Sequence, residues 1–285
     1  PAHLCAQLVF VGLLYGILAW PTRRWWWVSA GMLYAGTLAL QTTFFGAGLM
    51  WCLMMLLSAL KGKAISAGWR YGLAGGGVLA LAVLLSFKYE YRKVVQETDP
   101  AQPALQVFTG MLWEQITHPE RCLQPEAVET IVNRFNQGYY TAQAMAWTPA
   151  QEPFTRGKTI ADDAWAALIP RFIDPDKHQA GGFNNMKRFA GVSGRSYSMN
   201  IGIFGEAYVN FGITGGIICL LGYGLLLGAL MALAFRYLDA PWWPYLFLPA
   251  LHVESDIGIV WNHLTKAGLV AISLIVLIRL FQKYR

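Results

Sequence analysis

Long apolar runs separated by short polar connections occupy residues 1–88 of the chain, and the same pattern returns after residue 200. A run of roughly 17 to 25 apolar residues is long enough to cross a bilayer as a helix. The pattern predicts membrane helices at about 4–20, 25–41, 43–60, 70–88, 213–235, 242–256 and 264–281. The 242–256 run is short and rich in proline, at Pro241, Pro244 and Pro249, so we expect it to be kinked or re-entrant.

A long polar segment, residues 88–199, separates the two apolar blocks and has helical patterns of its own. Apolar side chains recur at helical spacing from Val128 to Ala142, after a favourable first turn at Pro125. A second helix is predicted from Thr159 to Leu168. Glycines at 181, 182, 191 and 194 predict a mobile segment after it.

These elements predict an all-α integral membrane protein, a multispan helical bundle with a large, mainly helical periplasmic loop. The expected domains are four transmembrane helices in 1–88, the loop in 89–199, and a glycine-rich re-entrant segment with about three further transmembrane helices in 200–285.

Composition supports this class. Mean hydropathy is +0.38 and 13% of residues are charged, against about 25% in an average soluble domain. The net charge is +6, but basic and acidic residues are equally numerous in the polar segment. The excess therefore lies beside the apolar runs, which argues against nucleic acid as a partner.

The basic connections give the expected orientation, because positively charged loops stay in the cytoplasm. They contain Arg23, Arg24, Lys61, Lys63, Arg70, Arg236, Lys283 and Arg285. The polar segment is then outside the membrane and the C-terminus is cytoplasmic. The chain begins at Pro1 without an initiator methionine, so we expect further helices to precede it.

Four scattered cysteines predict neither an internal disulfide nor a Cys/His metal site.

The first group of candidate residues is basic. Paired donors on arginine suit phosphate oxygens, and several loop cations could meet at the membrane surface: Arg134, Arg171, Lys177, Lys187, Arg188 and Arg195. The alternative is a set of solvated surface charges.

The second group is Glu206, Tyr208 and Asn210, placed where an apolar run begins. Ionisable groups at membrane depth usually face a protein-lined cavity. On a helix, Glu206 and Asn210 would share one face and Tyr208 would point elsewhere; in an extended segment all three would share a side. The alternative is that Glu206 is a structural acid paired with a loop arginine.

The third group is His252, Glu254, Asp256 and His263, with Lys266 nearby. Its spacing does not match a metal-binding motif such as HExxH. Sugar binding or proton transfer is one interpretation, and an ordinary polar helix end is the other.

Four stretches, in this order and spacing, resemble the Wzy-type O-antigen and exopolysaccharide repeat-unit polymerases. They are Arg134-Phe135, Gly157-Lys158-Thr159, Leu168-Ile169-Pro170-Arg171-Phe172 leading to Pro175-Asp176-Lys177, and Gly205-Glu206-Ala207-Tyr208-Val209-Asn210-Phe211-Gly212. The resemblance covers about a third of the chain. His178 departs from it, since the family often has proline there.

The resemblance implies a glycosyltransferase of the bacterial inner membrane that uses neither metal nor cofactor. A growing glycan leaves its polyprenyl (undecaprenyl) diphosphate carrier and joins a sugar hydroxyl of the next lipid-linked repeat unit. Arg134 and Arg171 would stabilise the diphosphate, with Lys177, Arg188 and Arg195 in support. Glu206 would orient or deprotonate the acceptor, and Tyr208, Asn210 and His252 would bind sugar.

The implied partners are polyprenyl-diphosphate-linked oligosaccharides, membrane lipids, and a chain-length regulator or other polysaccharide-assembly membrane proteins. Two alternatives stay open. An O-antigen ligase or protein O-oligosaccharyltransferase has similar donor chemistry with a different acceptor. A non-catalytic glycolipid-binding membrane subunit would not need Arg171 or Glu206.

Overall fold

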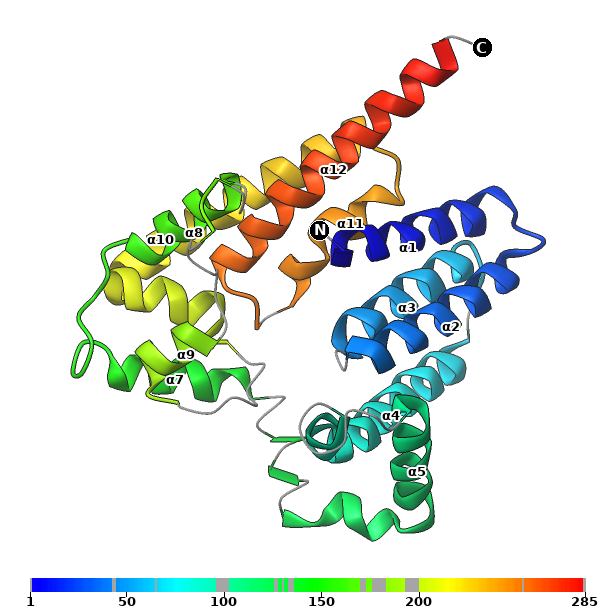
Figure 1. The fold of residues 1–285 in the computed structure, drawn as a ribbon, viewed down its shortest axis with the longest axis horizontal. Coiled ribbons are helices and arrows are strands. Elements are labelled where there is room, and N and C mark those ends of the chain that lie inside the picture. Colours follow the sequence, from blue (N-terminus) through cyan, green and yellow to red (C-terminus); the bar gives the residue numbers. More distant parts are fainter. Residues whose placement is uncertain are drawn as a thin grey trace. The chain divides into compact units, whose positions relative to one another are not determined.

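The computed structural model describes residues 2–42, 45–64, 66–95, 103–125, 128–129, 131–132, 136–169, 173–175, 183–192, 200–252 and 254–283. The described residues form helices and connections, without a strand (Figure 1). The chain divides into two compact units, one made of Pro1–Val11 and Gln137–Arg285 and the other of Gly12–Asn136.

The Gly12–Asn136 unit is a set of apolar helices. It contains the second part of α1 (Ala2–Ala19), then α2 (Arg24–Thr42), α3 (Phe45–Leu60), α4 (Ala67–Lys93), α5 (Ala104–Thr117) and η2 (Pro119–Leu123). Its core joins α2, α3, α4 and α5. Phe108 of α5 stacks on Phe45 and contacts Phe87 and Tyr91 edge to face. Part of the polar segment, α5, thus completes this helical unit.

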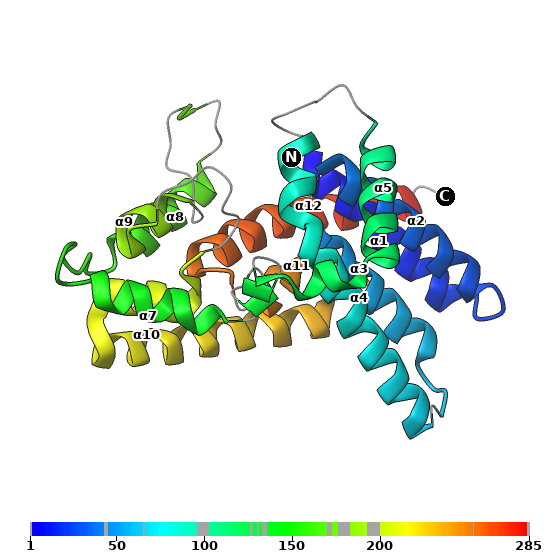
Figure 2. The same cartoon turned by 90° about the horizontal axis from the view of Figure 1, so that it is seen from below.

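The other unit carries the candidate site. Its remaining helices are α7 (Gln137–Trp147), α8 (Lys158–Leu168), α9 (Phe183–Ala190), α10 (Gly202–Tyr237), α11 (Trp242–Phe247), η3 (Leu248–Leu251) and α12 (Ile257–Lys283). Figures 1 and 2 both show the long part of α10 beside α12, running in the same direction. Phe235 stacks on Trp243, and the His263 ring donates a hydrogen bond to the Tyr245 carbonyl. Residues 238–256 therefore return the chain from the end of α10 to its start.

Helix α10 bends sharply at Gly212, whose φ of 68° and ψ of −165° are not helical. A Cβ added to Gly216 would lie 3.2 Å from the Ala207 carbonyl oxygen, whereas these residues would be about 13 Å apart along a straight helix. The arm before Gly212 thus folds back on the arm after it. The first arm, which carries Glu206, consequently lies beside the start of the long arm.

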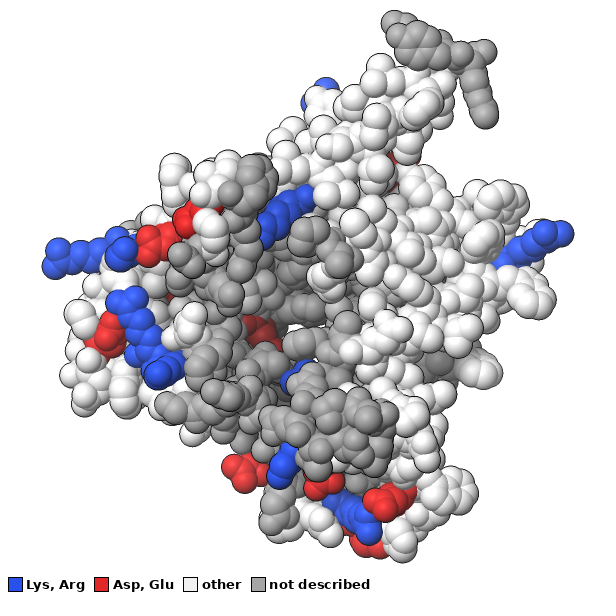
Figure 3. Space-filling model, in the orientation of Figure 1, with Lys and Arg blue, Asp and Glu red and all other residues white. Residues whose placement is uncertain are grey.

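Three described helices are long and apolar enough to cross a membrane, in α4, α10 and α12. Two shorter apolar helices lie at His3–Ala19 and Phe45–Leu60. Along α12 the surface carries few charges, whereas charged side chains gather near α7 and α8 (Figure 3). These features indicate a helical membrane protein. Within the predicted 242–256 run, regular structure is divided into the short α11 and η3, so the segment is kinked as its prolines predict.

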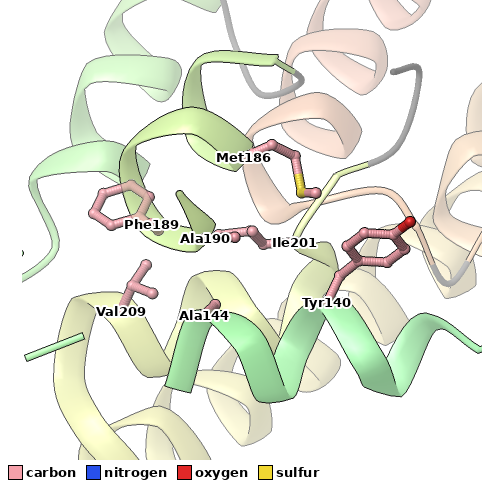
Figure 4. Packing of buried hydrophobic residues seen from close by; sticks show 7 residues of the cluster. All are labelled: Tyr140, Ala144, Met186, Phe189, Ala190, Ile201 and Val209. Carbon is pink, nitrogen blue, oxygen red and sulfur yellow. The ribbon is translucent and has the colours of Figure 1, made fainter. Parts of the chain in front are cut away.

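Within the polar segment, the predicted helix from Thr159 to Leu168 is confirmed as α8. Part of the predicted 125–142 helix lies outside the described residues, and α7 covers its end. The predicted mobile segment contains a helix instead, α9. Its Met186, Phe189 and Ala190 pack with α7 and the first arm of α10 around a buried core (Figure 4), which stabilises the helix.

Replacing Gly212 with alanine should destabilise the protein, because its φ/ψ region is essentially restricted to glycine. The expected loss is about 1–3 kcal/mol, measured by thermal unfolding in detergent. Gly222→Ala, on the same helix with open space around its Cα, is the matched control and should not destabilise. Equal stability of the two variants would contradict the bend.

Candidate functional site

Three fully buried carboxylates gather where α8, α10 and α12 meet: Asp163, Glu206 and Asp256, here called the carboxylate cluster. They come from three separate segments of the chain. Asp163 lies in the middle of α8, Glu206 in the first arm of α10, and Asp256 directly before α12. Burying charged groups is costly unless hydrogen bonds compensate, so their partners define the site.

Asp256 caps α12 and ties it to two other segments. Its Oδ1 accepts a hydrogen bond from the Ile259 amide at 2.8 Å, the usual pattern of an N-terminal cap. Its Oδ2 accepts bonds from the side-chain amides of Asn185 at 3.2 Å and Asn200 at 2.5 Å. Asn185 belongs to α9 and Asn200 precedes α10, so one carboxylate fixes both against the start of α12.

Glu206 satisfies the remaining amides of that first turn. Its Oε2 accepts bonds from the backbone N–H of Ile257 at 2.6 Å and of Gly258 at 3.4 Å. Its Oε1 accepts one from the Thr159 hydroxyl at 3.4 Å. The unpaired amides and the positive end of a helix dipole both favour a carboxylate at this position. Glu206 therefore joins α10, α12 and α8.

Asn210, one turn after Glu206, extends the same network. Its side-chain amide donates to the Thr159 hydroxyl at 2.7 Å and to the Glu206 carbonyl at 2.8 Å. Its side-chain oxygen accepts from the Thr155 hydroxyl at 2.5 Å. The helical alternative for residues 205–212 is thus correct, because Glu206 and Asn210 share a buried face and Tyr208 points elsewhere.

The loop before α8 also binds the bend in α10. Because Gly212 interrupts the helix, the carbonyls of Val209 and Asn210 lose their usual donors one turn later. The backbone amides of Thr155 and Arg156 supply replacements, at 3.0 and 2.9 Å. Arg156 adopts a left-handed φ of 53° to do so. Such strain in a non-glycine residue is typical of sites where geometry matters.

Asp163 lies directly against α12. A Cβ on Gly258 would overlap the Asp163 carboxylate, so only glycine permits this approach. Burial, and then the negative charges of Asp256 and Asp162, raise the pKa of Asp163 to about 7. Burial also raises the pKa of Asp256, against the opposing effect of its hydrogen bonds from Ile259, Asn200 and Asn185.

The other described members of the predicted groups lie as follows. Tyr208 donates to the Thr148 carbonyl at 3.2 Å and packs on Phe154. Arg188 is an exposed residue of α9, paired with Glu152 at 2.5 Å. His252 is half-buried in the turn between η3 and α12. Arg134, Arg171, Lys177 and Arg195 lie outside the described residues.

The third predicted group is divided. Asp256 belongs to the carboxylate cluster, whereas His263 bonds the Tyr245 carbonyl at 2.8 Å. Among the described residues, no set of histidine, cysteine and acidic side chains has a metal-binding arrangement.

Sequence reasoning overlooked Asp163, Asn185 and Asn200. One signal was available for Asp163: Thr159, Asp163, Ala166 and Ala167 share a helical face of small and polar side chains. Such a face permits close packing against another helix, here α12. The two asparagines had no comparable signal.

Chemically, the arrangement holds carboxyl groups and hydroxyl or amide donors in fixed positions beside a membrane-length helix. It can position neighbouring segments and can retain a proton on the cluster near neutral pH. Comparison with protein-family models, curated proteins and solved structures found no match to this chain.

The stability of the protein should fall as pH rises from about 4 to about 7. In that window folded Asp163 keeps its proton while the unfolded chain, with its ordinary pKa, has lost it. Asp163→Asn should therefore reduce the difference in Tm between about pH 5 and about pH 8. The control is Glu114→Gln, which removes an exposed ion pair with Arg121 and does not change the surroundings of Asp163. An unchanged pH profile in Asp163→Asn would contradict the buried carboxyl.

Proposed function

We propose that this chain polymerises lipid-linked oligosaccharide repeat units, as a Wzy-type glycosyltransferase does. The growing glycan is transferred from a polyprenyl diphosphate to a sugar hydroxyl of the next unit. The observation that carries the proposal is spatial: two of the stretches that resemble this family, Gly157-Lys158-Thr159 and 205–212, are hydrogen-bonded to each other.

The hydrogen bonds between these two stretches support the proposal because the stretches are far apart in sequence. Thr159 contacts both Glu206 and Asn210, and the loop before α8 binds the carbonyls at the bend. Residues from a polar segment and from a membrane-length helix thus form one unit. A reaction on a lipid-linked glycan needs both, since the carrier is in the bilayer and the sugars are in water.

The orientation belongs to the same proposal. We place the chain in the bacterial inner membrane as a multispan bundle, with most of residues 89–199 periplasmic and the C-terminus in the cytoplasm, from the basic connections. Because α10 and α12 run in the same direction, both helices start on the periplasmic side in this orientation.

In this proposal, basic side chains bind the diphosphate of the donor. Leaving-group charge develops on phosphate oxygens, and arginine stabilises it with paired donors in a site that excludes water. Arg134 and Arg171 have this role in the proposal, with Lys177, Arg188 and Arg195 in support.

Glu206 is assigned a positioning role. Of its two expected roles, base or structural acid, its burial and its bonds to Ile257, Gly258 and Thr159 favour the second. Among the residues that the structure describes, these partners are two backbone amides and one hydroxyl, and none is an arginine. Through them, Glu206 keeps Asn210 and the loop before α8 in place, and Tyr208 and His252 remain the proposed sugar contacts.

The function is tested in cells that lack this protein, by measuring the length of lipid-linked glycans. Single repeat units should accumulate, and the wild-type chain should restore long polymer. Arg171→Ala and Arg134→Ala should fail to restore it while inserting normally, because the diphosphate loses its donors. Arg121→Ala, which breaks an exposed pair with Glu114, should restore it fully.

Two other results would reject the polymerase. If long lipid-linked polymer persists and only its transfer to a final acceptor is lost, the protein is a ligase. If both arginine variants restore normal polymer, the donor assignment is wrong.

The role of Glu206 is tested by two substitutions. Glu206→Gln should keep much of the activity, because its amide oxygen can still accept from the α12 amides. Glu206→Ala should cost about 1–3 kcal/mol of stability by leaving buried amides without an acceptor, seen as a lower Tm in detergent. Glu114→Gln, an exposed residue, is the control. A loss of about 10² to 10⁴-fold in turnover for Glu206→Gln, with unchanged Tm, would instead identify a base.

A further inference from the structure

Helix α8 has its polar and apolar faces reversed relative to a helix on a water-exposed surface. At about 100° per residue, its buried residues Thr159, Asp163, Ala166 and Ala167 fall within a sector of roughly 100°. The opposite sector carries the exposed residues Lys158, Ala161, Trp165 and Leu168. Trp165 is 65% exposed and Leu168 is 62% exposed. The helix therefore buries an acid and a hydroxyl while it exposes its two largest apolar side chains.

Helix α9, in the same polar segment, has the opposite arrangement. It buries Met186 and Phe189, and it exposes Lys187 and Arg188. This is the usual pattern for a helix that faces water. The reversal in α8 is thus a property of that helix and does not extend to the whole segment.

Further exposed apolar side chains lie next to α8. The helix packs along α12 more extensively than any other described helix pair in this unit. At its start, Gly157 lies against Phe211, since a Cβ there would be 3.0 Å from the Phe211 ring. Phe211 and Ile213 flank the bend and are themselves exposed, at 41% and 68%. An exposed apolar surface therefore lies at both the start of α8 and the start of the long arm of α10.

We propose that the exposed face of α8, formed by Ala161, Trp165 and Leu168, lies in the lipid surface of the membrane. Tryptophan is favoured at that depth because its ring is apolar and its N–H can bond the headgroup region. Leu168 is buried in lipid instead of facing water. Lys158, at the start of the same sector and paired with Asp162, can keep its amine in the headgroup region while its aliphatic stem lies along apolar surface.

This inference uses the membrane placement of α10 and α12 in the proposed function but not the chemistry of that function. It makes α8 a lipid-facing element held inward by Thr159 and Asp163. The carboxylate cluster then lies on the protein side of a helix whose opposite face contacts lipid, at the height where the headgroup of a lipid-linked substrate would be found.

The test uses spin labels on the full chain in lipid nanodiscs, after replacement of Cys5, Cys52, Cys122 and Cys219. Labels at Trp165→Cys and Leu168→Cys should be more accessible to oxygen, which concentrates in lipid, than to a water-soluble nickel chelate. A label at Lys187→Cys, on the water-facing α9, is the matched control and should show the reverse order.

Two results would overturn the inference. Labels at 165 and 168 that follow the nickel pattern of 187 would place the face in water. Labels that neither reagent reaches would show that a protein, such as a second copy of this chain, covers it. A second measurement needs no cysteine replacement. The fluorescence of Trp165 is the part of the wild-type emission that Trp165→Phe lacks, and lipids brominated near the headgroup should quench it. Emission from Trp165 that these lipids do not quench would contradict the proposal. Neither measurement depends on polymer synthesis, so the proposed function can fail separately.

Discussion

The first turn of α12 is the point on which the rest of this unit depends. Its backbone amides begin inside the protein, where water cannot satisfy them, so acceptors must come from side chains. Asp256 and Glu206 supply those acceptors from two segments. The same carboxylates then accept from Thr159, Asn185 and Asn200, which brings α8, α9 and the start of α10 to one place.

The bend at Gly212 makes this geometry possible. Without it, Glu206 would continue outward along the axis of α10, away from the α12 amides. Folding the first arm back places Glu206 beside the long arm, and the close contact of Gly216 with Ala207 fixes that packing. The carbonyls freed by the bend are then bound by Thr155 and Arg156. The loop before α8 and the bend therefore stabilise each other.

This organisation connects the proposed chemistry to the membrane. Two of the stretches that resemble repeat-unit polymerases, Gly157-Lys158-Thr159 and 205–212, meet beside the bend, and the polar network holds them in fixed relation. The reversed faces of α8 place acid and hydroxyl groups inside and apolar groups outside. A protein built in this way positions polar groups close to lipid without exposing them to it, which suits a reaction whose donor is anchored in the bilayer.

The sequence by itself determined the helical membrane class and the helix from Thr159 to Leu168, but it left open whether Glu206 and Asn210 share a helical face. Those features follow from local rules of apolar run length and helical periodicity. Tertiary structure decided the rest. The bend at Gly212 needs donors from residues 155–156, and α9 forms because Met186 and Phe189 have a core to enter. Asp163, Asn185 and Asn200 joined the site through contacts between segments far apart in the chain. The small and polar face of α8 is a local signal for Asp163, whereas no local pattern encodes the contacts of the two asparagines.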